Sequence, residues 1–310
     1  MTVPLVFLVG PTATGKSEVA LDLAESIGAE IINADSMQFY RGMNIGTAKL
    51  SLSARRGIPH HLIDTHDVHQ EASVAEYQRD GRTIIDDLRR QSIPVVVVGG
   101  SGLYVKALVD SLNFPGTDAG VRERLELEVR ELGVATMHSR LASVDPAAAL
   151  AILPGNARRI IRALEVIEIT GAPFTAMLPR QGASHYSDAI QIGLQINREA
   201  LVDRINSRVD QMWEAGFVDE VNRLDAIGLR DGKIARGALG YLQILRSLDG
   251  AITSEEARAE TKVATRKYAR RQMSWFRRDE RISWVGPDEA LARASSLLAK
   301  KLRTDGKIIK

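Results

Sequence analysis

Hydrophobic positions along the chain form short uninterrupted runs that are separated by longer amphipathic stretches. The runs PLVFLVG (4–10), AEIINAD (29–35) and IPVVVVGG (93–100) are short, and the first is bounded by Pro4 and Gly10. Such runs are typical of strands that are buried on both faces of a parallel sheet. Between them, residues 18–27 and 74–88 carry apolar side chains at helical spacing. The alternation of strand and helix predicts an α/β fold with a parallel sheet flanked by helices.

The periodicity changes in the middle of the chain. Residues 118–187 show helical spacing throughout and contain no convincing strand pattern, whereas SDAIQIGLQI (187–196) again has the pattern of a strand. We therefore expect a core of residues 1–117 and 188–310, interrupted by an all-helical insertion at 118–187. Long amphipathic helices are predicted from residue 198 to about residue 278, and RISWVG (281–286) is predicted as a last edge strand.

Composition narrows the class of protein but names no partner. The 310 residues are 45% hydrophobic, which suffices for a large buried core, and 41 basic residues nearly balance 39 acidic ones. Cysteine is absent, which excludes disulfides, thiolate metal sites and cysteine nucleophiles and suits a reducing compartment. The apolar run at the N-terminus is too short to span a bilayer and has no basic leader. We expect a soluble cytoplasmic protein without a membrane partner, and a monomer.

A phosphate-binding signature joins the first predicted strand to the first predicted helix. The octapeptide GPTATGKS matches G-x-x-x-x-G-K-[ST] at every fixed position. Its main-chain amides, the following helix N-terminus and Lys16 are expected to hold a di- or triphosphate, while Ser17 offers a hydroxyl to Mg²⁺, the predicted cofactor. The predicted phosphate-binding residues are Gly10, Pro11, Thr12, Ala13, Thr14, Gly15, Lys16 and Ser17.

The position of acidic residues argues against a nucleotide hydrolase. Such enzymes place a carboxylate at the end of an apolar strand, but the run at 95–98 ends in Gly99-Gly100-Ser101. Asp35, at the end of the second run, is predicted to face the crevice at the carboxyl ends of the strands. From the residues alone, it is a metal ligand, a base acting on an acceptor, or a turn residue. A base beside a phosphate loop describes a transferase, with the Ser101 hydroxyl in the same crevice.

Two histidines are adjacent in GIPHHLID. His60 and His61 point to different faces, and no carboxylate completes a set of three ligands, so a structural role near the active-site loop is favoured over a metal site.

Positive charge is concentrated in residues 262–281, where eight residues are Lys or Arg and two are acidic. Lys262, Arg266 and Arg270 recur every four residues on one helical face, and Tyr268 and Trp275 share another. The segment is either a packed aromatic stripe with a solvated basic face or a surface that follows an RNA backbone. A second basic cluster in the insertion contains Arg158, Arg159 and Arg162.

Several motifs together resemble the tRNA dimethylallyltransferases, also called isopentenyl-tRNA transferases, over essentially the whole chain. They are GPTATGKS, INADSMQFYRGMNIGTAK, GIPHHLID, VVVVGGSGLYVKAL, RRIIRALEVIEITG, RINSRVDQM and TRKYARRQMSWFRR, in family order. The resemblance implies a P-loop NTPase-like core and transfer of a dimethylallyl group from dimethylallyl diphosphate to N6 of adenine 37, next to the anticodon of tRNA. It also implies that the phosphate loop holds the leaving diphosphate with Mg²⁺, so that the loop need not bind a nucleotide such as ATP in catalysis.

The resemblance also assigns roles to individual residues. It makes Asp35 the base or hydrogen-bond acceptor at the adenine amine, and it gives Ser101 the place of the family's usual threonine. The segment 158–162 carries arginine at Arg158, where the family usually has glutamine, and GALGYLQ departs from the usual Ala-Ile-Gly-Tyr-Lys-Glu. The implied contacts to the anticodon stem-loop are Asp35, Ser36, Met37, Gln38, Ser101, Arg158, Arg159, Ile160, Ile161 and Arg162.

Three other functions remain possible from the residues. A small-molecule phosphate-loop kinase would use ATP as donor and Asp35 as base, and a prenyltransferase acting on free adenine nucleotides would use the same crevice. Neither requires two basic surfaces for RNA. A nucleotide-switched RNA-binding protein is less well supported, because the strand-end carboxylate of such switches is missing.

Overall fold

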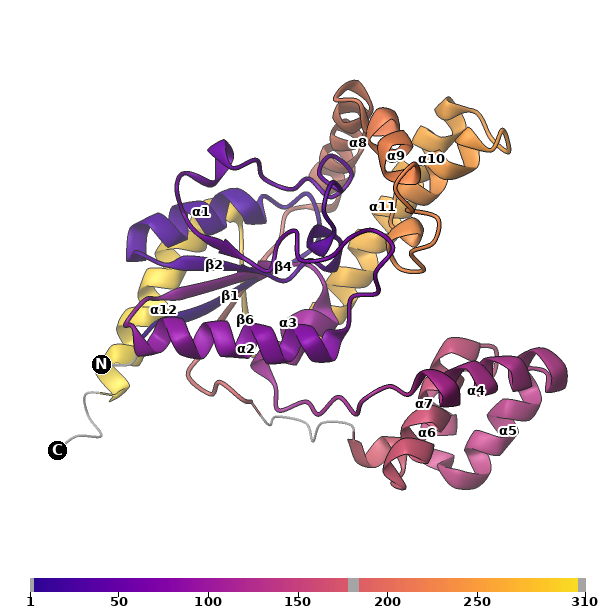
Figure 1. Cartoon of the computed structure of the whole chain (residues 1–310). Coiled ribbons are helices and arrows are strands. Elements are labelled where there is room, and N and C mark those ends of the chain that lie inside the picture. Colours follow the sequence, from indigo (N-terminus) through magenta and orange to yellow (C-terminus); the bar gives the residue numbers. More distant parts are fainter. Residues whose placement is uncertain (1–2, 178–183, 306–310) are drawn as a thin grey trace. The chain divides into compact units, whose positions relative to one another are not determined.

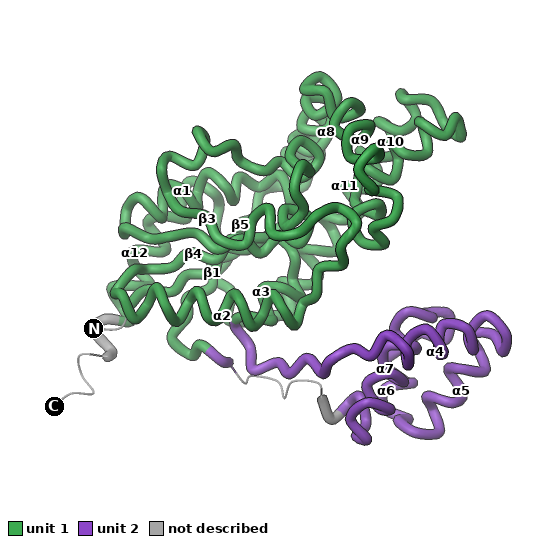
Figure 2. The backbone as a smooth tube through the Cα atoms, in the orientation of Figure 1, with its two compact units in different colours: residues 1–108, 186–310 green, residues 109–185 purple. Residues whose placement is uncertain are grey.

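The computed structural model describes residues 3–177 and 184–305. The chain forms two compact units, one of residues 1–108 and 186–310 and the other of residues 109–185 (Figure 2). The second unit starts at residue 109, before the predicted insertion 118–187. The reason is that the segment entering the unit pairs with the segment leaving it. Asp110 and Ser184 form an antiparallel bridge, and the Ser184 hydroxyl donates a 3.0 Å hydrogen bond to the Val109 carbonyl.

The first unit is built on a six-stranded sheet in the order β3-β2-β4-β1-β5-β6, in which every paired strand is parallel. The five predicted strands all form, and β6 lies at an edge as expected. The other edge strand, β3, has two residues and was not predicted from the sequence. The strands are β1 (Leu5–Val9), β2 (Glu30–Asn33), β3 (His60–His61), β4 (Val95–Gly99), β5 (Ile190–Leu194) and β6 (Ile282–Val285).

Helices cover both faces of this sheet (Figure 1). On one face lie α1 (Lys16–Ile27) and α12 (Ala290–Asp305), whose Leu21, Leu23 and Ala294 join a core with strand residues such as Leu8 and Ile192. On the other face lie α2 (Val74–Arg90) and α3 (Gly102–Val109). The parallel sheet between two helical layers confirms the predicted α/β class. Because the strands are parallel, the loops after β1, β2, β4 and β5 all lie at the carboxyl end of the sheet.

Beyond β5 the first unit continues as a group of helices, α8 (Arg198–Glu214), α9 (Phe217–Asp225), α10 (Tyr241–Leu248) and α11 (Ser254–Phe276). Figure 1 shows them gathered at one end of the sheet. The Asn197 side chain caps α8 through the Ala200 amide at 2.7 Å, and Thr253 with Glu256 forms a capping box at the start of α11. Each cap contributes about 1 kcal/mol to helix stability.

The second unit consists of α4 (Ala119–Leu132), α5 (Val134–Val144), α6 (Pro146–Ala151) and α7 (Ala157–Thr170). These helices share a core of their own that includes Leu125, Leu141, Ile160 and Leu164. The all-helical character predicted from the periodicity is therefore found in the described residues of this unit, apart from the single bridge at its base. Among all described residues, no helix has the length and apolar character that a bilayer crossing requires.

Candidate active site

The phosphate loop connects β1 to α1, as the sequence predicts, and two glycines set its shape. Gly10 has φ +140°, and a Cβ there would lie 2.6 Å from the Leu194 carbonyl oxygen of β5. Gly15 has φ +90°, in the region that side chains disfavour. Inside the loop, the buried Thr14 hydroxyl donates to the Pro11 carbonyl at 2.9 Å. The loop therefore has a fixed conformation that depends on glycine at both positions.

Two cations meet at this loop. The ammonium group of Lys16 donates to the Pro11 carbonyl at 2.7 Å, and burial lowers its pKa to about 8, with Asp35 raising the pKa and Arg208 lowering it further. Arg208 comes from α8 and donates to the Thr12 hydroxyl at 3.4 Å. Sequence reasoning did not single out Arg208, although RINSRVDQM is one of the motifs that carry the resemblance. The two side chains thus place positive charge at the loop, as the predicted binding of a diphosphate requires.

Asp35 follows β2 and lies in the electrostatic field of both cations. Burial raises the pKa of Asp35, whereas a 3.0 Å hydrogen bond from the Met37 amide, Lys16 and Arg208 lower it. The same hydrogen bond caps a short 3₁₀ helix, η1 (Ser36–Phe39). Asp35 therefore takes the turn role at the end of the strand, and its carboxylate also interacts electrostatically with Lys16 of the phosphate loop, while its role as a base stays a prediction.

Ser101 joins the loop after β4 to the loop after β2. Its hydroxyl accepts a hydrogen bond from the Ser36 amide at 3.3 Å and lies 3.5 Å from the Ser36 hydroxyl oxygen. Its own amide donates to the Ala34 carbonyl at 3.3 Å. The predicted residues Asp35, Ser36 and Ser101 are thus brought together, since β2 and β4 are neighbours in the sheet.

Helix α11 closes the site with two uncharged polar side chains that were not predicted to act there. The Gln272 side chain accepts from the Thr12 amide at 2.9 Å and donates to the Gly100 carbonyl at 3.0 Å. Burial and Asp35 raise the pKa of Tyr268 to about 12, against the opposing influence of Ser101 and Gln272. Gln272 thereby ties the phosphate loop to the turn after β4. No sequence signal marks it, because both partners lie more than 170 positions away.

The donor set suits magnesium. Ser17, whose hydroxyl is the expected protein ligand, is an exposed residue at the start of α1, where the phosphate loop ends. Mg²⁺ prefers oxygen ligands and commonly binds through one or two protein groups together with substrate phosphates. Within 3–177 and 184–305 there is no cluster of three His, Asp or Glu side chains that would form a site from protein alone. The residues present therefore fit an ion that arrives with a diphosphate.

The remaining predicted RNA-contacting residues near the site lie on η1. Ser36, Met37 and Gln38 are half-buried, and the Gln38 side chain donates to the Thr47 carbonyl at 3.2 Å. The histidine pair forms β3, where His61 Nε2 lies 2.6 Å from a Glu30 carboxylate oxygen and His60 Nδ1 lies 2.8 Å from the Ile58 carbonyl oxygen. Both rings are thus in hydrogen-bonding positions at the sheet edge.

Opposite sides of α11 differ in their contacts. Tyr268 lies beside the site, and Trp275 packs against Gly102, where a Cβ would approach its ring to 2.2 Å. On the basic face, Lys262 forms a 2.6 Å ion pair with Asp210, and Arg266 donates to the Asn206 side chain at 2.5 Å. Two of the three residues on the predicted basic face thus pair with α8, and the interpretation of the segment as an RNA surface stays a prediction.

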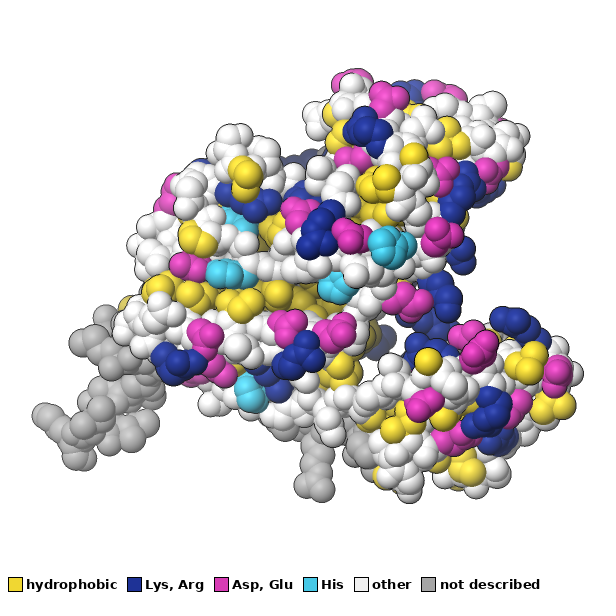
Figure 3. Space-filling model, viewed as in Figure 1, with side chains coloured by type: hydrophobic (Ala, Val, Ile, Leu, Met, Phe, Trp, Pro, Cys, Tyr) yellow, Lys and Arg dark blue, Asp and Glu magenta, His cyan; other side chains and the backbone are white. Residues whose placement is uncertain are grey.

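A groove of about 520 Å³ runs between the start of α8 and α11. Leu201, Ile205 and Met273 are among its apolar lining residues. Three exposed arginines, Arg198, Arg270 and Arg277, also line it, and they form no ion pair with any described residue. Elsewhere, basic and acidic side chains are interspersed over the face of the molecule shown in Figure 3. The groove is thus a local concentration of uncompensated positive charge.

The basic cluster of the second unit is only partly exposed. Arg158 and Arg159 are exposed at the start of α7, whereas Ile160 is fully buried in the unit's core and Ile161 is half-buried against it. Arg162 donates to the Pro115 carbonyl at 2.7 Å and to the carboxylate of buried Glu165 at 2.9 Å. In this conformation, Arg158 and Arg159 are the two members of the cluster whose charged groups face solvent.

Comparison with known proteins identifies relatives of the chain. The model of the IPP transferase family matches residues 38–279. A tRNA dimethylallyltransferase of Streptomyces griseus is 57% identical over 91% of this chain and 90% of its own, and one of Thermobifida fusca is 56% identical over 96% and 94%.

Solved structures agree with these sequence matches. A full-length tRNA isopentenylpyrophosphate transferase of Bacillus halodurans matches 99% of both chains at 39% identity, with a TM-score of 0.72. A eukaryotic dimethylallyltransferase acting on tRNA matches 88% of this chain and 69% of its own at 27% identity, with a TM-score of 0.77. The chain therefore belongs to the IPP transferase family.

Proposed function

We propose that this enzyme transfers a dimethylallyl group from dimethylallyl diphosphate to N6 of adenine 37 of tRNA, next to the anticodon, and releases diphosphate. Transfer of a dimethylallyl group to tRNA is the activity of the named relatives, which cover nearly the whole chain. The observation that carries the proposal is the meeting of Asp35 with Lys16 and Arg208 at the phosphate loop. An acceptor base and an anion site for the leaving group thus share one crevice.

The proposed reaction exchanges the carbon–oxygen bond of the donor for a carbon–nitrogen bond and moves one proton. As N6 bonds to the allylic carbon, the bond from that carbon to the diphosphate oxygen breaks, and ionised Asp35 takes the proton that N6 loses. The loop amides, Lys16 and Arg208 stabilise the charge that gathers on the diphosphate. Ser17 would be the protein ligand of Mg²⁺, which when bound neutralises part of the diphosphate charge.

Several groups support tRNA as the acceptor. An adenine next to the anticodon must leave its stack to reach a crevice, which costs a few kcal/mol that contacts along the RNA offset. We assign contacts near the base to Asp35, Ser36, Met37, Gln38 and Ser101. We assign backbone contacts to Arg158 and Arg159, which are exposed on the second unit, and to the arginines of the α8–α11 groove.

The proposal is tested by giving the purified enzyme, with Mg²⁺ and labelled dimethylallyl diphosphate, a choice between unmodified tRNA and AMP. Label is expected in tRNA alone. Label in AMP would instead establish the nucleotide-prenylating alternative, and transfer of phosphate from ATP to a small molecule would establish the kinase. RNA-stimulated ATP hydrolysis without label transfer would establish the nucleotide-switched RNA-binding alternative.

We further propose that the enzyme works as a monomer in the cytoplasm, a reducing compartment that suits a chain without cysteine. Light scattering at assay concentration is expected to give the 33.9 kDa mass of one chain, and a mass of twice that value would contradict the monomer.

A further inference from the structure

Glu220, on α9, has a buried carboxylate that is stabilised by hydrogen bonds from backbone amides. Its side chain accepts hydrogen bonds from the amides of Asn44, Ile45 and Gly46 at 3.1, 2.7 and 3.3 Å, and from the Tyr241 hydroxyl at 2.6 Å. Glu220 is 3% exposed and has no ion-pair partner among the described residues. A buried charge is costly unless it is compensated in this way, so the carboxylate and the three amides depend on each other.

The three amides form a cradle that aromatic rings seal. Successive main-chain amides that converge on one point bind anions, and here the anion is supplied by the protein itself. At Gly46, a Cβ would lie 2.3 Å from the Phe217 ring and 2.4 Å from the Tyr241 ring, so the backbone lies directly against both. Residues 43–49, which we call the clamp segment, are thereby fixed on α9 and α10.

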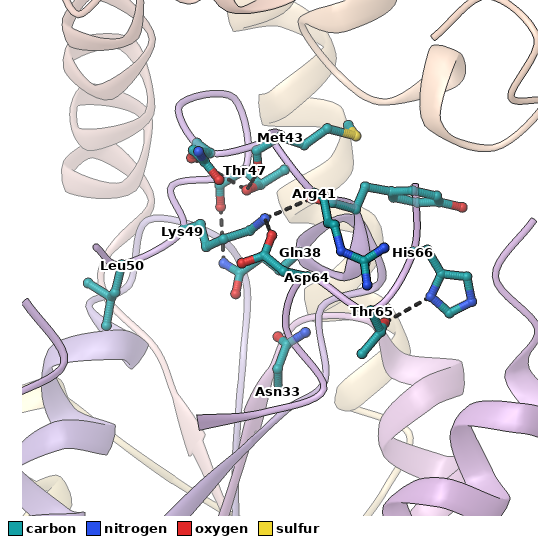
Figure 4. Close-up of polar contacts among 12 residues, drawn as sticks. Asn33, Gln38, Arg41, Met43, Thr47, Lys49, Leu50, Asp64, Thr65 and His66 are labelled. Carbon is teal, nitrogen blue, oxygen red and sulfur yellow. Dashed lines mark hydrogen bonds and ion pairs between the residues drawn. The ribbon is translucent and has the colours of Figure 1, made fainter. Parts of the chain in front are cut away.

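The clamp segment in turn holds Gln38. The Thr47 carbonyl accepts from the Gln38 side chain at 3.2 Å, and the Thr47 hydroxyl donates to the Met43 carbonyl at 2.6 Å (Figure 4). At the end of the segment, the Lys49 ammonium group donates to the Tyr40 carbonyl at 2.7 Å and to the Asp64 carboxylate at 2.5 Å (Figure 4). The segment is thus tied both to α9 and to the chain around η1.

This arrangement fixes which way the Gln38 amide points. A carbonyl oxygen requires a donor, so the nitrogen of the Gln38 side chain must face Thr47 and its oxygen must face away. The Gln38 backbone is held as well, because its amide donates to the Asp35 carbonyl at 3.1 Å and its carbonyl accepts from the Asp64 amide at 3.2 Å. A glutamine amide with a fixed orientation can discriminate the donors and acceptors on the edge of a base.

We propose that Glu220 is a positioning residue of the transfer reaction, which orders the clamp segment and so orients the Gln38 side chain toward the target nucleotide. The inference rests on the proposed function, in which Gln38 contacts tRNA, and extends it to a residue that does not touch either substrate. Loss of this positioning is expected to lower kcat/KM for tRNA and to leave KM for dimethylallyl diphosphate unchanged. The two effects separate because the phosphate loop is held by Gln272 and not by the clamp segment.

The test compares the steady-state kinetics of the full-length enzyme with those of Glu220→Gln. This variant replaces one carboxylate oxygen by an NH₂ group, which is a donor and cannot accept hydrogen bonds from the backbone amides of the clamp segment. We expect kcat/KM for tRNA to fall about tenfold or more, since a small misplacement of a positioning group costs up to ~100-fold. KM for dimethylallyl diphosphate is expected to stay within about twofold by the same reasoning. Glu256→Gln is the matched control: this carboxylate accepts the Thr253 amide at 2.7 Å at the start of α11, and its loss should leave both constants unchanged.

A second comparison separates positioning from a general loss of structure. In a Gln38→Ala background, Glu220→Gln is expected to cause little further loss, because the group through which it acts is gone. Should Glu220→Gln not fold, Glu220→Asp, which keeps the charge on a shorter side chain, takes its place with the same expected pattern. Equal losses in both backgrounds, or normal use of tRNA by a folded Glu220 variant, would overturn the inference. A wild-type enzyme that labels no tRNA would refute the proposed function itself.

Discussion

At the scale of single residues, the proposed chemistry depends on opposite charges that interact in partly buried positions. Burial raises the pKa of the Asp35 carboxyl and lowers that of the Lys16 ammonium group, while each group favours the charged form of the other. The net effect is a raised pKa, so the Asp35 carboxylate is a stronger base than an exposed aspartate. This balance is what a base needs when it must accept a proton beside a phosphate loop.

Replacement of Asp35 tests its role directly. Asp35→Asn keeps the size of the side chain and an oxygen for the Met37 amide, but it removes the base. We expect turnover to fall by about 10²–10⁴-fold, the usual contribution of a general base, while tRNA affinity changes little. Single-turnover transfer and filter binding measure the two quantities. Full turnover by the variant would assign the proton acceptor elsewhere.

The pH profile of kcat/KM for dimethylallyl diphosphate reports the free enzyme and should be bell-shaped. Toward acid, the rate falls as Asp35 is protonated, at a pH above the ordinary range of aspartate because its pKa is raised. Toward alkali, the rate falls as Lys16, with a pKa of about 8, loses the charge that binds diphosphate. Lys16→Arg should move the alkaline limb upward, since arginine stays charged. An alkaline limb at the same pH in Lys16→Arg would show that another group titrates there.

At the level of residues, the sequence allows a prediction where the chemistry follows from spacing. The phosphate loop is recognisable because its eight positions are contiguous, and Asp35 because it ends an apolar run. Arg208, Glu220 and Gln272 could not be found in this way, because their partners at Thr12, Asn44 and Gly100 are brought to them by the fold. A polar side chain on an amphipathic helix carries no local sign of what it will contact.

At the scale of elements, α11 is the helix that connects the candidate site to the arginine-lined groove proposed to bind RNA. One side carries Tyr268, Gln272 and Trp275 toward the loops, and another carries Arg270 and Arg277 into the groove beside α8. Helical spacing predicted this division between an aromatic and a basic face. It could not show that Lys262 and Arg266 pair with α8, because the acceptors Asp210 and Asn206 lie on a different element.

The link from α11 to the phosphate loop is tested by Gln272→Met. The Thr12 amide and the Gly100 carbonyl would lose their partner inside the protein, at a cost of about 1–3 kcal/mol each. We expect a lower free energy of unfolding in urea and a higher KM for dimethylallyl diphosphate. Gln243→Met is the matched control, because this buried glutamine accepts the Gly240 amide at 2.8 Å within α10. It should lower stability alone, and an equal rise in KM in both variants would contradict the assignment.

The groove between α8 and α11 predicts a salt-dependent interaction with RNA. Arg270→Gln and Arg277→Gln should each weaken tRNA binding and reduce the slope of log affinity against log salt by about 0.7–0.9 for each phosphate that the arginine neutralises. Arg230→Gln serves as the control, because Arg230 is already paired with Asp225 and Asp249. Unchanged slopes in the groove variants would place the RNA backbone on another surface.

At the scale of the whole molecule, the chain forms two units with separate cores. The sheet and its carboxyl-end loops carry the proposed transfer site within the first unit, and the second unit packs its helices around Leu125, Leu141 and Ile160. The change of period near residue 118 predicted a separate helical unit, because no apolar strand run lies between the helical segments of residues 118–187. The second unit begins at residue 109 and ends at residue 185, and Asp110 pairs with Ser184 at its two ends. This pairing could not be predicted, because neither segment alone shows which partner it will meet.

The most direct test of the proposed activity is to locate the group on the RNA. Purified enzyme is incubated with Mg²⁺, dimethylallyl diphosphate and an unmodified tRNA that has adenine at position 37, in parallel with the same tRNA carrying guanine there. Mass spectrometry of nuclease fragments should find one dimethylallyl group, on adenine 37 of the first tRNA, and none on the second. Equal modification of both tRNAs, or of a different adenine, would contradict the proposed activity.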